Sequence, residues 1–352
     1  MQSPSKAISK LFSPCKDKEE RMHYANIRII GWGHYAPEKT ITNHDFEQMM
    51  DTSDEWITTR SGIKRRHYAH PDETSSTMGY EAAKKALLVA GIQPEEVDLL
   101  VVGTSSQDMI FPSTACLIAG KLGCPSPMAF DVSAGCTGFL HGFSIATQFL
   151  NAGLYKTALV IGADTITRYT DFSDRSTAIL FGDGAGAILM TTKDASCPMV
   201  LAETHGSDSS GADKLYLRGG GSAHPIHVRS IQNHENVLYM NGKEIFKFAV
   251  KISDTILDSL FSQTGLKPEE IDHYLFHQAN YRIIESAANR LHIPQEKLIV
   301  TIHEYGNTSS ATIPMALSVS KDSGTIIPGQ KIVLVAFGAG LTWGGMLIQW
   351  NR

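Results

Sequence analysis

Three side chains suited to covalent catalysis each follow a short apolar run of the sequence: Cys136, His277 and Asn307. A cysteine thiolate is a strong nucleophile, and a histidine and an asparagine can supply a base or hydrogen-bond donors beside it. Each residue also has a purely structural interpretation. Free cysteine is among the most buried residue types, a histidine can be satisfied within a core, and an asparagine often shapes a turn. Together, the three predict one catalytic site.

The stretch around Cys136 predicts a strand, a tight turn and a helix. Residues 128–132 form an apolar run typical of a short buried strand, and a helical pattern begins at residue 137 and stops at Gly153. The residues between, Ser-Ala-Gly, are small enough for a tight turn. A cysteine in the first turn of a helix lies near the positive end of the macrodipole, which favours the thiolate.

The other two residues follow strands predicted at 274–276 and 298–302. Ligands of open α/β sheets gather at the carboxyl ends of strands, so we expect all three side chains to converge. Glycines in FGAGLTWGG at 337–345 would let backbone N–H groups approach a negatively charged oxygen. The GDGAG stretch at 182–186 lacks the spacing of a dinucleotide-binding loop and runs into a predicted strand, so we do not assign it that role.

Apolar periodicity predicts the further elements that position this site. Strands are expected at 26–33, 97–103, 157–162 and 181–190, and helices at 43–50, 76–90, 112–120 and 245–260. The run at 97–103 is apolar throughout, which is typical of a strand buried on both faces. Asn43 is expected to cap the first of the helices, and Gly91 to end the second.

Two pairs of matching segments indicate an internal duplication. AGIQPEEVDL at 90–99 resembles TGLKPEEIDH at 264–273, and KTALVIGAD at 156–164 resembles KIVLVAFGA at 331–339 at nearly the same spacing. We therefore expect two similar α/β halves, residues 25–195 and 196–352, joined through a loop-rich stretch around 191–240.

The composition is that of a globular protein without a general affinity for nucleic acid. The chain has 352 residues, of which 42% are hydrophobic, and a formal net charge of −5, whereas nucleic-acid binding needs a basic surplus. No apolar run approaches the roughly 18 residues of a membrane span. Five cysteines without a CxxC pair indicate neither a disulfide framework nor a zinc site, so a reducing cytosol is the expected location.

Two polar stretches receive no catalytic role. Residues 1–24 are polar and charged and lack the apolar core of a signal peptide, so we interpret them as a disordered or tag-like extension. His224, His227 and His234 lie in a stretch rich in glycine and serine, and their spacing suits no metal site. A solvated loop is the favoured interpretation.

Seven motifs in order resemble one enzyme family, β-ketoacyl-acyl-carrier-protein synthase III, which begins type II fatty-acid synthesis. They are DTSDEWITTRSGIKRRH, the Phe111-Pro112 segment, DVSAGCTGF, SDRSTAILFGDGAGA, FHQAN, YGNTS and AFGAGLTWG. The resemblance runs from about residue 27 to the C-terminus. It implies the thiolase fold, with two similar βαβαβαββ halves in a five-layered αβαβα arrangement, and a homodimer.

The resemblance also implies a role for each central residue. Cys136 would attack an acyl-CoA thioester and carry the acyl group. His277 and Asn307 would hold the malonyl thioester and stabilise the enolate that forms as carbon dioxide leaves. Backbone N–H groups of Cys136 and Ala339 would bind the tetrahedral oxyanion. Two neutral donors suit this chemistry, because a cationic histidine would pair with the departing carboxylate, so we predict a neutral His277.

Substrate-binding positions follow from the same resemblance. The residues implied for CoA are Thr52, Trp56, Arg60, Arg175, Gly242, Phe246 and Asn280. Phe111 would limit the acyl pocket and favour short primers such as acetyl, while Lys247 and Arg282 would receive the acidic carrier protein. The partners implied are acyl-CoA, malonyl-acyl-carrier protein and a second copy of the chain, with no metal and no permanently bound cofactor.

Three other functions use parts of the same pattern. A natural-product acyltransferase or specialised condensing enzyme on this fold would keep Cys136, and the HQAN and GNTS segments favour decarboxylative condensation over acyl transfer alone. A cysteine hydrolase would also use a cysteine, a histidine and an asparagine, but the set of Trp56, Arg60 and Arg175 argues against it. A non-catalytic subunit would be expected to lack the nucleophile or the histidine.

Overall fold

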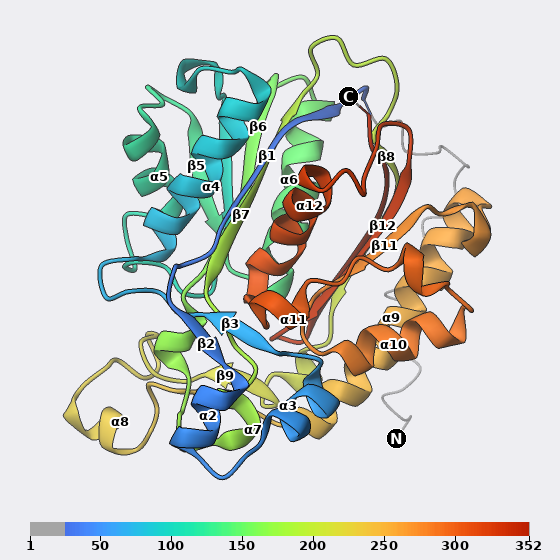
Figure 1. Cartoon of the computed structure of the whole chain (residues 1–352). Helices are drawn as coiled ribbons and strands as arrows, with labels where there is room; N and C mark the ends of the chain where they lie inside the picture. Colours follow the sequence, from blue (N-terminus) through green and yellow to red (C-terminus); the bar gives the residue numbers. More distant parts are fainter. Residues whose placement is uncertain (1–24, 352) are drawn as a thin grey trace, which may run out of the picture.

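The computed structural model describes residues 25–351, which form two large β-sheets with helices between and outside them (Figure 1). The extension predicted at 1–24 lies outside the described residues. The first sheet has the order β1 (Arg28–Tyr35), β7 (Gly184–Thr191), β6 (Thr157–Asp164), β4 (Leu99–Gly103) and β5 (Met128–Val132). The second has the order β11 (His273–Phe276), β12 (Lys331–Gly338), β13 (Thr342–Gln349) and β8 (Val200–Ser207).

Helices complete five layers. α4 (Ser75–Ala90) and α5 (Thr114–Leu122) cover the outer face of the first sheet, and α9 (Gly242–Thr264) and α10 (Tyr281–Arg290) cover that of the second. α6 (Gly138–Asn151) and α12 (Thr312–Asp322) lie between the sheets (Figure 1). All residues of β4 and β6 are buried, since helices cover both faces of these strands. The αβαβα arrangement is as expected.

Short elements gather at the end of the molecule where the site lies. They are β2 (Thr40–Thr42), α2 (Asn43–Met49), α3 (Asp54–Ser61), β3 (Arg65–His67), α7 (Arg175–Ala178), β9 (Leu215–Leu217), α8 (Val228–Gln232), β10 (Leu238–Met240) and α11 (Ile302–Tyr305). β2 pairs with β3, and β9 pairs with β10. The stretch 191–240 is therefore less irregular than expected, since it includes β8 of the second sheet.

The same order of elements occurs twice, which supports the predicted duplication. In the first half β4, α5, β5, α6, β6 and β7 follow one another, and in the second β11, α10, a bridge at Leu298, α12, β12 and β13 do so. The matching segments Pro94–Glu96 and Pro268–Glu270 both form a 3-10 turn before a parallel strand. The division of the chain at residue 195 stays a prediction.

Two expectations about local structure are wrong. Thr42, not Asn43, caps α2, because the Thr42 hydroxyl accepts the backbone N–H of Asp45 at 3.2 Å. The side chain of Asn43 is used elsewhere and donates to the Ile63 carbonyl at 2.7 Å. β5 is only partly buried, with Met128 40% exposed, because it forms the edge of the first sheet.

The strand expected at 298–302 is also wrong. This segment makes one parallel bridge, from Leu298 to Tyr274, and then leaves the sheet. The side-chain oxygen of Gln278 accepts the backbone N–H groups of Thr301 at 2.9 Å and Ile302 at 3.1 Å, so these groups are unavailable for a strand ladder. α11 begins at Ile302, and Asn307 consequently follows a helical turn.

Candidate active site

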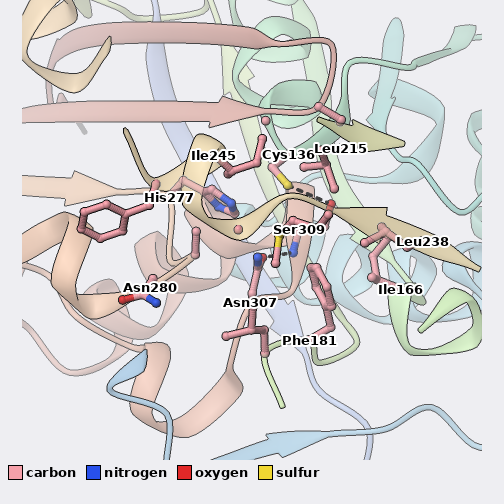
Figure 2. A pocket seen from close by; sticks show the side chains of 18 of the residues that line it. Cys136, Ile166, Phe181, Leu215, Leu238, Ile245, His277, Asn280, Asn307 and Ser309 are labelled. Atoms are coloured by element: carbon pink, nitrogen blue, oxygen red, sulfur yellow. Dashed lines mark hydrogen bonds between the residues drawn. The ribbon is translucent and has the colours of Figure 1, made fainter. Parts of the chain in front are cut away.

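The structure brings Cys136, His277 and Asn307 together around one cavity of about 400 Å³ (Figure 2). Cys136 comes from the first half of the chain, and His277 and Asn307 come from the second. The cavity lies where the loops of both halves meet, as expected from the ends of β5 and β11.

Cys136 lies in the 3-10 turn Gly135–Thr137 that joins β5 to α6. Gly135 has a φ of +57°, and a Cβ on it would lie 2.9 Å from the backbone nitrogen of Ala339. A Cβ on Gly338 would lie 2.6 Å from the backbone nitrogen of Cys136. Glycine is therefore required at both positions for the two loops to approach each other. This approach places the Cys136 and Ala339 backbones side by side at the cavity.

Burial raises the pKa of the Cys136 thiol to about 12. The nearby carboxylate of Asp164 acts in the same direction, while a hydrogen bond from the Ser309 hydroxyl, with Oγ 3.5 Å from Sγ, acts against it. Loss of hydration therefore opposes the thiolate that the helix terminus is expected to favour.

This pKa predicts the pH dependence of Cys136 alkylation. Far below its pKa, the thiolate fraction rises about tenfold for each pH unit. We expect the iodoacetamide rate at Cys136, measured by peptide mass spectrometry, to rise steadily between about pH 7 and about pH 9, since both lie below the pKa. The Cys136→Ala variant identifies modification of the other cysteines. A plateau near neutral pH would show instead that the dipole prevails.

His277 follows β11 and is 2% exposed. Its backbone N–H donates to the Val335 carbonyl at 2.7 Å, and its ring meets the ring of Phe337 edge-on, with centroids 5.4 Å apart. Ring atom Nδ1 lies 2.7 Å from Oγ1 of Thr312. Burial lowers the pKa of His277 to about 3, in agreement with the predicted neutral imidazole.

Asn307 is held in the turn between α11 and α12 by its backbone and its side-chain oxygen. Its N–H donates to the Leu180 carbonyl at 2.9 Å, and its carbonyl accepts from Gly182 at 3.1 Å. Oδ1 accepts the backbone N–H of Ser309 at 2.9 Å. The amide nitrogen of the side chain is thereby the group that can donate into the cavity.

The sequence interpretation missed two residues that fix this turn, Ser309 and Asp164. Ser309 has a φ of +54°, which is uncommon outside glycine and costs of order 1 kcal/mol or more. The next residue, Ser310, donates its N–H and hydroxyl to the buried carboxylate of Asp164 at 3.0 and 2.6 Å. Asp164 ends the apolar run of β6, and an acidic residue in that position was the signal in the sequence that could have identified it.

The residues implied for CoA divide into two groups. Trp56, Arg60, Gly242, Phe246 and Asn280 line the cavity, whereas Thr52 and Arg175 do not. Arg175 nevertheless lies over the Trp56 ring, with its guanidinium carbon 4.6 Å from the ring centroid, and Arg60 lies 5.3 Å from the same centroid. An aromatic ring with two cations close to it is suited to a flat heterocycle and to phosphates.

Lys247 and Arg282, implied for carrier-protein docking, differ in their positions. Arg282 lines the cavity, with its guanidinium carbon 5.8 Å from the Phe246 ring centroid. Lys247 is outside the cavity and pairs with Glu244 at 2.9 Å on the same exposed helix, α9. An exposed pair of this kind contributes little to stability, so Lys247 is free to exchange partners.

Phe111 does not line the cavity of its own chain and is 81% exposed. It lies just before α5, whose first N–H groups are held by Asp131 of the edge strand β5. Apolar side chains that line the cavity together with Cys136 include Ile166, Phe181, Leu215 and Leu238 (Figure 2). Leu215 and Leu238 belong to the β9–β10 pair, which the sequence interpretation treated as loop.

Two expected absences concern metals and membranes. Within residues 25–351, no group of three or more histidine, cysteine, aspartate or glutamate side chains is placed to hold a metal ion. None of the helices in this part of the chain has the length and apolar character needed to cross a membrane.

Family models and curated proteins of one family match this chain over most of its length. Residues 130–209 match the family model for 3-oxoacyl-[acyl-carrier-protein] synthase III, and residues 261–350 match the model for its C-terminal part. The chain is 44% identical to a beta-ketoacyl-[acyl-carrier-protein] synthase III of Caldanaerobacter subterraneus, over 92% of this chain and 98% of that protein.

Solved structures of the same family are similar to this chain over most of its length. The 3-oxoacyl-[acyl-carrier-protein] synthase III of Aquifex aeolicus superimposes with a TM-score of 0.84 and 41% identity, over 92% of this chain and 99% of the other. The priming beta-ketosynthase of the R1128 polyketide pathway superimposes with a TM-score of 0.85 but 32% identity, over 96% of this chain and 99% of the other.

Proposed function

Because the chain belongs to the β-ketoacyl-[acyl-carrier-protein] synthase III family and has its thiolase fold, we propose the following reaction for the cavity around Cys136. The protein condenses a short acyl-CoA primer, acetyl-CoA in the first instance, with malonyl-acyl-carrier protein. The products are 3-ketoacyl-acyl-carrier protein, carbon dioxide and free CoA, and this step starts type II fatty-acid synthesis. The observation that carries the proposal is the meeting of Cys136 with a neutral His277 and Asn307 in one cavity.

The first half-reaction transfers the acyl group to Cys136. A new bond forms between its sulfur and the acyl carbon, and the bond from that carbon to the CoA sulfur breaks. His277 is a poor base for the thiol, because burial lowers its pKa to about 3 and raises that of Cys136 to about 12. In the net reaction the thiol proton therefore goes to the departing CoA sulfur. The Ser309 hydroxyl, 3.5 Å from Sγ, assists by donating to the developing thiolate.

The second half-reaction removes carbon dioxide from the malonyl group. The electron pair of the broken carbon–carbon bond moves toward the thioester oxygen, and N–H groups of His277 and Asn307 stabilise the charge that forms there. The enolate carbon then attacks the acyl-cysteine. Backbone N–H groups of Cys136 and Ala339 bind the resulting oxyanion. As it collapses, the bond from the acyl carbon to the Cys136 sulfur breaks, and the sulfur takes up a proton from solvent, which restores the thiol for another cycle.

Substrate groups are assigned along the cavity from its mouth inward. Trp56, Arg60 and Arg175 bind the nucleotide end of CoA, with Thr52 beside them. Gly242, Phe246 and Asn280 border the pantetheine arm. Arg282 at the mouth and Lys247 on α9 attract the acidic carrier protein.

The primer and the homodimer are linked through Phe111. The wall of Ile166, Phe181, Leu215 and Leu238 suits a short apolar acyl group. Because Phe111 lies outside the cavity of its own chain, it limits primer length only by entering the cavity of a second copy. The exposed side chains of Met109, Ile110 and Phe111, which precede the helix α5 that packs on the edge strand β5, support pairing of two copies at this side.

Intact-protein mass spectrometry tests the proposed function. Acetyl-CoA is expected to add one acetyl group, which peptide mapping locates at Cys136. Malonyl-acyl-carrier protein is then expected to discharge this adduct with release of carbon dioxide and formation of 3-ketobutyryl-carrier protein. Acylation only by larger acyl-CoAs would favour a specialised condensing enzyme. This alternative is considered because the chain is 32% identical to a priming polyketide ketosynthase. Absence of any adduct would contradict both.

A further inference from the structure

A buried arginine, Arg66, is the middle residue of β3, one of the short elements that gather at the end of the molecule where α2, α3 and α7 lie (Figure 1). Its side chain is 0% exposed, and its guanidinium carbon lies 4.6 Å from the ring centroid of Phe46. Burial lowers the pKa of Arg66 to about 10, so the side chain remains charged near neutral pH. The oxygens that accept its hydrogen bonds are uncharged. Because burying a cation on neutral acceptors is costly, the stability of the fold does not by itself explain an arginine here.

The guanidinium of Arg66 joins two separate segments of the chain. Its Nη1 donates to Oδ1 of Asn43, the first residue of α2, at 2.8 Å. Its Nη2 donates to the carbonyl of Ile179, which directly follows α7, at 2.5 Å. A planar guanidinium carries several N–H groups in a fixed geometry, so one side chain holds both acceptors at a set separation.

Asn43 extends this link to α3. Its Nδ2 donates to Oδ1 of Asp54 at 2.8 Å and to the carbonyl of Ile63 at 2.7 Å. Asp54 is the first residue of α3, and Ile63 follows Gly62, where the helix ends. One buried amide group therefore holds both ends of α3.

The two segments that Arg66 joins carry the aromatic ring and the cations assigned to the nucleotide end of CoA. Trp56 and Arg60 belong to α3, and Arg175 is the first residue of α7. We propose that Arg66 is a positioning residue that fixes α3 relative to α7, and with them Trp56 relative to Arg175, for binding of the CoA nucleotide. This inference rests on the proposed function, which places that nucleotide beside Trp56. A site that is ordered before its ligand arrives binds more tightly, because less freedom is lost on binding.

The test compares two thioesters in the variant Arg66→Met, which removes the guanidinium. A Cβ on Gly306 would lie 3.1 Å from the Cβ of Arg66, so a substitution that keeps this Cβ preserves the packing beside the turn of Asn307. Acetyl-CoA carries the nucleotide, whereas acetyl-pantetheine has the same thioester and arm without it. Intact-protein mass spectrometry gives the second-order rate constant for acylation of Cys136. We expect this constant to fall about tenfold with acetyl-CoA and to stay within about twofold of the wild type with acetyl-pantetheine, because only acetyl-CoA uses the ordered nucleotide site.

Asn43→Ala separates the geometry of this link from the charge of Arg66. It leaves the guanidinium in place but removes its connection to α3, so it should also slow acylation by acetyl-CoA and spare acylation by acetyl-pantetheine. The double variant is expected to lose roughly tenfold rather than roughly a hundredfold, because both changes break one link. Asn43→Ala also carries the test if Arg66→Met yields no folded protein.

The control for a general loss of stability is Leu159→Ala. Leu159 is a buried residue of β6 in the core cluster beneath α4, whereas Trp56 packs against a different cluster. Its truncation should lower the melting temperature. At a temperature where this variant is folded, the ratio of the two acylation rate constants is expected to equal that of the wild type.

Three outcomes would overturn the inference. They are an equal loss with both thioesters in Arg66→Met, no loss with either, or wild-type rates in Asn43→Ala, which would assign the effect to charge alone. Failure of the proposed function looks different, since the wild type itself would then acylate Cys136 with neither thioester. Calorimetric titration with CoA would still compare the wild type with Arg66→Met, for which about tenfold weaker binding is expected.

Discussion

The Cys136→Ala variant is expected to form no acyl adduct with acetyl-CoA and to lose condensation by about 10⁴-fold or more, the scale seen when a covalent nucleophile is removed. The substitution deletes only the sulfur atom. It leaves His277 and Asn307 in place, and their hydrogen bonds run to Thr312, Leu180 and Ser309 rather than to Cys136. Decarboxylation of malonyl-acyl-carrier protein is therefore expected to persist without condensation.

Mass spectrometry and carbon dioxide release measure the two effects separately. The matched control is Cys116→Ala, because Cys116 is an exposed free cysteine on α5 and should be dispensable. An acetyl adduct on another cysteine of Cys136→Ala, together with retained condensation, would assign the nucleophile elsewhere.

The His277→Ala variant is expected to lose decarboxylation by about 10²- to 10³-fold, the usual effect of removing one preorganised donor from a developing oxyanion. Acylation of Cys136 should fall much less, because the imidazole is not the base in that step. Asn307→Ala is expected to act on the same half-reaction. The double variant should lose less than the product of the two single effects, since both donors serve one oxygen.

The pH dependence separates a neutral donor from a cationic one. Because burial lowers the pKa of His277 to about 3, the ring stays neutral as the pH falls from about 8 to about 5. Single-turnover decarboxylation is therefore expected to show no loss from protonation of this histidine across that range. A fall in rate that begins near pH 6.5 and disappears in His277→Ala would show that the ring titrates normally.

Local patterns in the sequence predicted most of the elements that position the site. Apolar runs predicted β4, β5 and β6 to within two residues at either end, because strands that helices cover on one or both faces are mostly apolar. The three central residues also converge as expected. Each of them follows the end of a strand or turn, and this can be recognised from the sequence alone.

What could not be predicted depends on contacts between distant residues. The pKa of Cys136 is set by burial under the loops of both halves, which the helical pattern after it does not encode. The segment 298–302 has the composition of a strand, but the side chain of Gln278 takes its N–H groups. Phe111 matches a family motif, yet its position depends on where the loop before α5 is directed.

The buried carboxylate of Asp164 has a consequence for the order of events during synthesis of the chain. It belongs to the first half, but the groups that it binds at Ser310 belong to the turn that carries Asn307 in the second. The Ser310 hydroxyl is also 2.7 Å from the carbonyl of Gly103, at the end of β4. A nascent chain therefore has its nucleophile early but has no ordered decarboxylating pair until the two halves dock. A chain cut short before the second half consequently lacks both residues of that pair, His277 and Asn307.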